Sequence, residues 1–224
     1  MYRFGVDEAG KGPVFGSMFA AAVWVGESAT LPEGIADSKR LTPARRETVA
    51  KAIQTTPGIE IAVAEITPDR IDEPTTDMNS LTVEAHARVI SDVLEGANSS
   101  TGGTSPPSGL CDACDTDADR FARRVSAVCH LEDVTIDARH GADDDSPLVG
   151  AASIIAKVER DAHMAALADE YGKVGSGYPS DRTTQQFLES YLESHGELPP
   201  FARRSWSTCK RALAETSQRG LEEF

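Results

Sequence analysis

Strand-like and helix-like segments alternate along this chain of 224 residues, and this order constrains its fold more than any other feature. Residues 59–66, Ile-Glu-Ile-Ala-Val-Ala-Glu-Ile, alternate in the manner of a half-buried strand. Thr42 followed by Pro43 has the pattern of a helix N-cap with proline at the first helical position. Further strands are predicted over 2–6, 14–25, 110–113 and 134–136, and further helices over 80–94, 117–128, 149–171, 183–195 and after Trp206. The chain is therefore predicted to be an α/β protein whose C-terminal end is helical.

One segment interrupts this pattern. Residues 96–108, Gly-Ala-Asn-Ser-Ser-Thr-Gly-Gly-Thr-Ser-Pro-Pro-Ser, are of low complexity. They lack the apolar side chains that would offset the entropy lost when a segment becomes ordered. We predict a flexible loop here, and we expect that shortening it has little effect.

The charge of the chain is strongly acidic. The formal net charge is −14, and 36 Asp and Glu residues stand against 6 Lys and 16 Arg. This balance is unusual for a protein that touches nucleic acid, whose binding surface is normally basic. We interpret it as an adaptation to high salt, where surface charges are screened within ~3 Å at 1 M. The alternative is an ordinary acidic cytosolic protein.

The sequence gives no sign of a membrane or of an oxidising compartment. It contains no run of about 18 apolar residues, and it enters a strand without a basic and apolar leader, so we expect a cytoplasmic protein with no membrane contact. Cys111 and Cys114 have the C-x-x-C spacing of a zinc half-site or a redox pair, but no second pair completes a site. We therefore expect the cysteines to be free thiols.

The clearest chemistry lies near the N-terminus, where Asp7 and Glu8 end the first strand and a Gly10-Lys11-Gly12 turn follows. Carboxylates hold hard divalent cations, and a glycine-rich turn with a cation suits a phosphate. This adjacency indicates metal-assisted phosphodiester chemistry, whereas the simpler reading is a solvated turn. Successive strand residues face opposite sides, so if both acids face the metal, the strand must end or bulge at Glu8. Gly10 and Gly12 would permit such a change of direction.

Six short motifs along the chain are informative as a set because of the order in which they follow one another. They are 7–13 (Asp-Glu-Ala-Gly-Lys-Gly-Pro), 37–41 (Asp-Ser-Lys-Arg-Leu), 112–115 (Asp-Ala-Cys-Asp), 142–161 (Ala142-Asp143 through Arg160-Asp161), 175–181 (Gly-Ser-Gly-Tyr-Pro-Ser-Asp) and 203–206 (Arg-Arg-Ser-Trp). On these motifs the chain resembles ribonuclease HII, the type 2 ribonuclease H family, in its archaeal form. The resemblance covers about residues 2–206 and lapses within 96–108. It implies a ribonuclease H-like mixed sheet flanked by helices, with a catalytic domain over 1–172 and a C-terminal helical extension over 173–224.

The resemblance also implies an activity and a metal site. Members of the family hydrolyse the RNA strand of RNA–DNA hybrids and cleave at ribonucleotides embedded in duplex DNA, leaving 3′-hydroxyl and 5′-phosphate ends. They use Mg²⁺ or Mn²⁺, with two ions during catalysis, and two ions ~4 Å apart can stabilise both the entering and the leaving oxygen. Four acids match the family's catalytic and metal-binding positions, namely Asp7, Glu8, Asp112 and Asp143. Asp115 and Asp144 are the alternatives to the last two.

The residues that match the family's substrate contacts are Gly10, Lys11, Gly12, Lys39 and Tyr178. Lys11 replaces the usual arginine of a Gly-Arg-Gly loop, which removes the planar fork that a guanidinium offers to phosphate. Tyr178 matches the tyrosine that stacks near the 2′-hydroxyl, the group that distinguishes RNA from DNA. Lys39 is a candidate phosphate contact, and a solvated loop lysine is the alternative. Ser153 and Lys157 lie one helical turn apart, and either substrate contact or helix packing accounts for them.

Two other classes of function are alternatives to this one. Another metal-dependent nuclease with a ribonuclease H fold is the main alternative, and a binding module without activity is a second. A phosphate-loop NTPase is excluded because the frame G-x-x-x-x-G-K-[ST] is absent. The expected partners are RNA–DNA hybrids, DNA with embedded ribonucleotides and a sliding clamp that binds the tail 220–224, although a disordered end also explains that tail. We expect a monomer.

Overall fold

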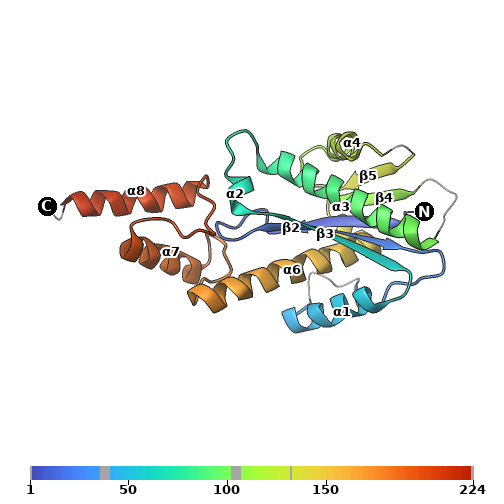
Figure 1. The fold of residues 1–224 in the computed structure, drawn as a ribbon, viewed down its shortest axis with the longest axis horizontal. Coiled ribbons are helices and arrows are strands. Elements are labelled where there is room, and N and C mark those ends of the chain that lie inside the picture. The colour runs from blue at the N-terminus through green and yellow to red at the C-terminus, as the bar shows by residue number, and fades with distance from the viewer. Residues whose placement is uncertain (1, 36–40, 102–106, 132, 223–224) are drawn as a thin grey trace. The chain divides into compact units, whose positions relative to one another are not determined.

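The structure of the chain is a computed structural model that describes residues 2–35, 41–101, 107–131 and 133–222 (Figure 1). The strands are β1 (Phe4–Ala9), β2 (Met18–Val25), β3 (Ile59–Ile66), β4 (Ser108–Asp112) and β5 (Thr135–Arg139). The helices are α1 (Pro43–Thr55), α2 (Pro68–Ile71), α3 (Met78–Thr101), α4 (Ala118–Cys129), α5 (Ala142–Asp145), α6 (Pro147–Tyr171), α7 (Arg182–His195) and α8 (Ser207–Glu222). The chain divides into two compact units: unit 1 (Met1–Ala9, Phe19–Glu65, Met78–Glu159) and unit 2 (Gly10–Met18, Ile66–Asp77, Arg160–Phe224).

The strands of the described residues form a mixed sheet in the order β3-β2-β1-β4-β5. Strand β1 lies at its centre, antiparallel to β2 and parallel to β4, and β4 is parallel to β5. The register pairs Glu8 with Ala20 across β1 and β2, and Val6 with Cys111 across β1 and β4. The predicted α/β class with a mixed, helix-flanked sheet is confirmed.

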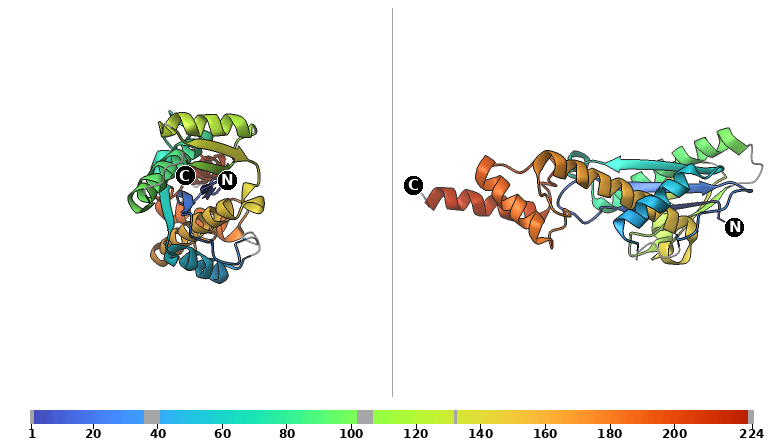
Figure 2. Two further views of the ribbon diagram at one scale, coloured as in Figure 1. Left: turned by 90° about the vertical axis from the view of Figure 1, so that its right-hand side faces the viewer. Right: turned by 90° about the horizontal axis from the view of Figure 1, so that it is seen from below.

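Helices cover both faces of this sheet in unit 1 (Figures 1 and 2). Helix α1 and the first part of α6 pack with β1–β3 in one apolar core, while α3 and α4 cover the other face. Two glycines permit close approach: a Cβ on Gly5 would lie 2.3 Å from the backbone carbon of Leu148, and one on Gly109 would lie 1.9 Å from the ring of Phe4. Gly5 thus marks the β1 face that α6 covers.

Unit 2 has a core of its own, built around aromatic rings. Phe15 meets Phe201 edge to face with ring centroids 5.2 Å apart, and residues of α6, α7 and α8 complete the cluster. Asp181 caps α7 and Gly196 ends it with a φ of 71°. The division predicted at residue 172 stays a prediction, and the unit that contains 173–224 also contains 10–18, 66–77 and 160–172.

Two segments differ most from the sequence-based expectation. Helix α3 continues to Thr101, so the predicted loop at 96–108 is wrong for its first six residues, and Ala97 extends the buried stripe of the helix. Residues 102–106 of that loop lie outside the described residues. Strand β2 begins at Met18 instead of residue 14, because the N–H of Val14 donates to the carbonyl of Gly177 rather than to a neighbouring strand.

Strand β1 ends at Ala9 and β5 at Arg139, each three residues later than predicted, and the short helices α2 and α5 have no predicted counterpart; the other boundaries lie within two residues of prediction. Strand β3 matches residues 59–66, and α1 starts where Thr42 caps it by accepting a hydrogen bond from the N–H of Arg45. Helix α8 reaches Glu222, so the disordered end predicted from residue 220 is helical as far as the chain is described. No helix in the described ranges combines the length and apolar character that a membrane crossing needs. All four cysteines are free thiols, as predicted.

Candidate active site

Asp7 lies on the face of the sheet that α6 covers, two residues after Gly5 on β1. It is only 6% exposed. Its carboxylate accepts hydrogen bonds from the N–H of Glu8, at 2.8 Å, and from the hydroxyl of Ser153 on α6. The ammonium group of Lys157 donates to Ser153 Oγ at 2.7 Å. Ser153 and Lys157 therefore form a chain of hydrogen bonds that ends on Asp7, and helix packing alone does not describe them.

Asp112 shares this face of the sheet. It follows Cys111, which is paired with Val6, on the strand next to β1. Leu110, two residues earlier, packs against Val149 of α6, so alternation places Asp112 on the same side. Asp112 Oδ1 accepts a hydrogen bond from the N–H of Ala142 at 2.7 Å, which holds the start of α5 against the end of β4.

Asp143 is the second residue of α5 and directly follows Ala142. It is buried, with 6% of its surface exposed, whereas Asp144 is exposed. The structure therefore buries Asp143, the predicted site residue, next to Ala142, whose N–H donates to Asp112. Its alternative, Asp144, stays exposed. The choice of Asp143 as a ligand stays a prediction.

Glu8 points to the opposite face of the sheet. Its Oε2 lies 2.9 Å from Nε2 of His86 on α3. Strand β1 neither ends nor bulges at Glu8, because regular antiparallel pairing continues through Glu8 and Ala9. The change of direction that would let both acids face the same side is therefore not made in β1, and Asp7 and Glu8 leave the strand on opposite sides.

The electrostatics of Asp7 suit a cation. Burial raises the pKa of Asp7 well above its ordinary value, and the negative charges of Glu8 and Asp112 raise it further, against the two hydrogen bonds that it accepts. Within the described ranges, no three carboxylate, imidazole or thiolate groups form a closed metal-binding cluster. The donor set is nevertheless one of carboxylate oxygens, which Mg²⁺ and Mn²⁺ prefer, and a bound cation would relieve the repulsion at Asp7.

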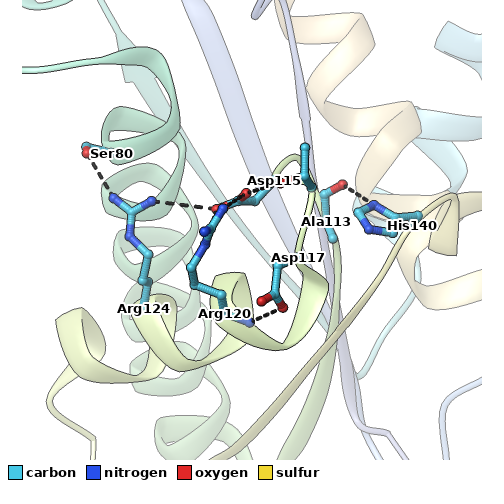
Figure 3. A network of polar contacts seen from close by, with 8 residues as sticks. Ser80, Ala113, Asp115, Asp117, Arg120, Arg124 and His140 are labelled. Carbon is cyan, nitrogen blue, oxygen red and sulfur yellow. Dashed lines mark hydrogen bonds and ion pairs between the residues drawn. The ribbon is translucent and has the colours of Figure 1, made fainter.

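Asp115 is committed to other contacts (Figure 3). It is buried and accepts hydrogen bonds from Arg120 Nε, at 3.1 Å, and from Arg120 Nη2. Arg124 lies 3.9 Å away and also donates to Ser80 Oγ on α3. The hydrogen bonds from Arg120 lower the pKa of Asp115 to about 2. Asp115 thus ties α4 to α3, and its contacts favour Asp112 as the metal ligand.

The turn over Gly10–Gly12 belongs to unit 2 and is held by a buried arginine. Gly10 has a φ of 89°, a conformation that favours glycine. Arg203 is fully buried and donates to the carbonyls of Gly10 (2.6 Å), Lys11 (3.0 Å) and Gly16 (2.9 Å). Trp206 Nε1 donates to the carbonyl of Pro13. The motif at 203–206 therefore fixes the backbone of the turn.

Tyr178 is exposed by 40% and lies beside the same turn in unit 2. The guanidinium carbon of Arg160 lies 5.0 Å from the centroid of its ring, and Arg160 also donates to the carbonyl of Ser176. A Cβ added to Gly12 would lie 3.7 Å from Cε1 of Tyr178. Asp181 accepts a hydrogen bond from the N–H of Ser176 at 2.6 Å and so rigidifies the turn that carries the tyrosine. A fixed, exposed ring next to a glycine turn suits base stacking.

Sequence reasoning missed several partners of these residues. His86 and Arg160 were not singled out, and Lys157 was not linked to Asp7. His86 carries a weak signal, because it is a polar residue on the apolar stripe of α3, between Val83 and Ile90. Lys39, the expected phosphate contact, lies outside the described residues.

The chain matches one family model and is similar to several known proteins. The model of the family "Ribonuclease HII" matches residues 4–209. The ribonuclease HII of Haloarcula marismortui is 56% identical over 99% of this chain and 100% of its own length. The crystal structure of ribonuclease H2 from Pyrococcus horikoshii is 35% identical, with a TM-score of 0.81, and the match covers 96% of this chain and 98% of that one. The ribonuclease HII of Archaeoglobus fulgidus, solved in a complex with PCNA, is 32% identical with a TM-score of 0.79 over 99% of both chains.

Proposed function

The chain belongs to the ribonuclease HII family, and from this premise we propose that it cleaves RNA in RNA–DNA hybrids and cuts duplex DNA at embedded ribonucleotides. Family membership makes it an endoribonuclease with a ribonuclease H-like fold. The proposal adds that it is metal-dependent and leaves 3′-hydroxyl and 5′-phosphate ends. One observation carries it: Asp7 and Asp112 lie on one face of adjacent strands, with Asp7 buried among negative charges.

In this proposal, four acids hold the metal: Asp7, Asp112 and Asp143, together with Glu8, which would reach it from the other side of β1. Mg²⁺ or Mn²⁺, as two ions during catalysis, would lower the pKa of the attacking water and stabilise charge on the phosphate oxygens. The chain itself supplies orientation. Ser153 and the N–H of Glu8 hold the carboxylate of Asp7, and the N–H of Ala142 holds that of Asp112.

The substrate is read by unit 2 residues in this proposal. Arg203 draws the carbonyls of Gly10 and Lys11 inward, so the turn keeps one conformation when the ribonucleotide approaches. Tyr178, held by Arg160, offers a ring face for stacking near the 2′-hydroxyl. Lys11 supplies a point charge to phosphate where the family usually has arginine, and Lys39 is proposed as a second phosphate contact.

We further propose the setting in which the enzyme works. The relative from Archaeoglobus fulgidus was solved with PCNA, which supports a sliding clamp as a partner, bound through the tail 220–224. The high identity to a protein from the halophile Haloarcula marismortui supports the reading of the acidic surface as a salt adaptation. We propose a cytoplasmic monomer.

A cleavage assay on two substrates tests the function. One is duplex DNA with a single ribonucleotide, and the other is a continuous RNA–DNA hybrid, each with Mg²⁺ or with EDTA. We expect metal-dependent cleavage of both and 5′-phosphate products. Cleavage of the hybrid alone would overturn the part of the proposal that concerns embedded ribonucleotides, and cleavage that EDTA does not reduce would overturn its metal dependence.

A further inference from the structure

Glu8 has a partner that its predicted role does not explain. His86 lies on α3, is fully buried, and places Nε2 2.9 Å from Oε2 of Glu8. The side chain of Glu8 is itself only 11% exposed. A carboxylate that binds a cation only accepts hydrogen bonds, so with Glu8 as a metal ligand Nε2 of His86 would be the donor in this pair.

The contact with Glu8 is the one hydrogen bond that His86 makes among the described residues. Its ring meets that of Phe121 edge to face, with centroids 5.2 Å apart and an interplanar angle of 84°. Its second nitrogen, Nδ1, is buried and has no hydrogen-bond partner among the described residues. A buried polar atom without a partner is destabilising. An apolar side chain of similar size would avoid that cost, so packing alone does not account for a histidine here.

We propose that His86 is a positioning residue for the metal site, which fixes the carboxylate of Glu8 through one oxygen and leaves the other oxygen for a divalent cation. This inference rests on the proposed role of Glu8 as a metal ligand. Glu8 leaves β1 on the face opposite to Asp7, whereas the carboxylate of Asp7 is held by Ser153 of α6. His86 is the group that orients it. Partners of this kind, which hydrogen-bond to a metal ligand, typically change metal affinity or activity by about 10–100-fold when they are removed.

The test compares His86→Phe, which keeps an aromatic ring but loses the donor, with His86→Gln, which keeps an N–H donor. Val89→Ala is the matched control, because Val89 is a buried residue of the same helix that carries no polar group. Mn²⁺ affinity is measured by calorimetry on the full chain without substrate, and the Mg²⁺ half-saturation of cleavage is measured in parallel. Thermal unfolding in EDTA reports the packing cost of each variant.

We expect His86→Phe to weaken Mn²⁺ binding and raise the Mg²⁺ half-saturation by about 10–100-fold. His86→Gln should recover part of this loss, and Val89→Ala should change neither quantity. In a Glu8→Gln background, His86→Phe should have no further effect on Mn²⁺ affinity. Unchanged Mn²⁺ affinity in His86→Phe, or an equal loss in the Glu8→Gln background, overturns the proposal. If His86→Phe does not fold, His86→Met carries the same expectations.

Glu8→Gln separates this inference from the proposed function. If Glu8→Gln leaves Mn²⁺ affinity and cleavage unchanged, Glu8 is not a ligand and the role of His86 fails with it, while the proposed cleavage activity stands. If Glu8→Gln weakens both while the His86 variants do not, the metal site stands and only the role of His86 is overturned.

Discussion

Removing the buried guanidinium of Arg203 is predicted to destabilise unit 2 and to impair substrate binding. The group donates to three backbone carbonyls, those of Gly10, Lys11 and Gly16, at 2.6–3.0 Å. Arg203→Met keeps much of the side-chain volume but leaves these carbonyls without their donor. Each orphaned carbonyl costs about 1–3 kcal/mol. Arg203→Met also removes a buried positive charge. Burial disfavours that charge, since it lowers the pKa of Arg203 to about 10, so its removal offsets part of the cost of the orphaned carbonyls. We therefore expect a net loss of about 3–5 kcal/mol, in the range seen when one partner of a buried ionic contact is removed.

For a chain of this size, each 1 kcal/mol lowers Tm by about 2–4 °C, so Arg203→Met should unfold roughly 6–20 °C earlier. Arg203→Lys should recover only part of this difference, because one ammonium group cannot reach the three carbonyls as the fork does. The assay is thermal unfolding in EDTA together with KM for a single-ribonucleotide duplex. At a temperature where the variant is folded, KM should rise more than kcat falls. A Tm within 2 °C of the parent and an unchanged KM would refute the reasoning.

Three further predictions concern the site and its solvent. Asp143→Ala should nearly abolish cleavage while Asp144→Ala should not, because Asp143 is buried and Asp144 exposed; the reverse result in initial rates would move the ligand to Asp144. Tyr178→Phe should keep most activity and Tyr178→Ala should lose about 1–3 kcal/mol of substrate binding, as a stacking role requires. Equal affinities of the parent and both variants in a binding titration would exclude a role of Tyr178 in recognising the ribonucleotide. Stability to urea and cleavage rate should both rise with KCl towards molar concentration, because the net charge of −14 is then screened; optima below about 0.15 M would show that the acidity is not a salt adaptation.

Local pattern in the sequence was enough to predict most of the elements. The alternation of residues 59–66 matches β3, and the Thr42-Pro43 cap fixes the start of α1, because both depend on neighbouring residues only. The start of β2 was wrong because the partner of Val14 is Gly177, a residue far along the chain. The predicted end of α3 is wrong because a polar, glycine-rich composition favours a loop, whereas the buried Ala97 extends the helix.

Prediction of the site from the sequence is limited in the same way by contacts between distant residues. Family motifs pointed to Asp7 and Asp112, and adjacent parallel strands place them side by side. The contacts that orient the site join distant residues, as in the pairs of Glu8 with His86 and of Gly10 with Arg203. Nothing in the spacing of one sequence encodes these pairs, because they depend on which helix packs on which face. Strand alternation did encode the separation of Asp7 from Glu8, and the structure keeps the alternation rather than breaking it.

The central claim is that the acids around Asp7 form a metal-dependent site for cleavage at ribonucleotides. Initial rates on duplex DNA with one embedded ribonucleotide, for the parent chain and for Asp7→Asn at equal Mg²⁺, test it most directly. We predict rapid cleavage by the parent, none in EDTA, and a near-complete loss in Asp7→Asn. The variant should also unfold no earlier than the parent in EDTA, because it removes a buried charge repelled by Glu8 and Asp112. Parent-like cleavage by Asp7→Asn would contradict the account.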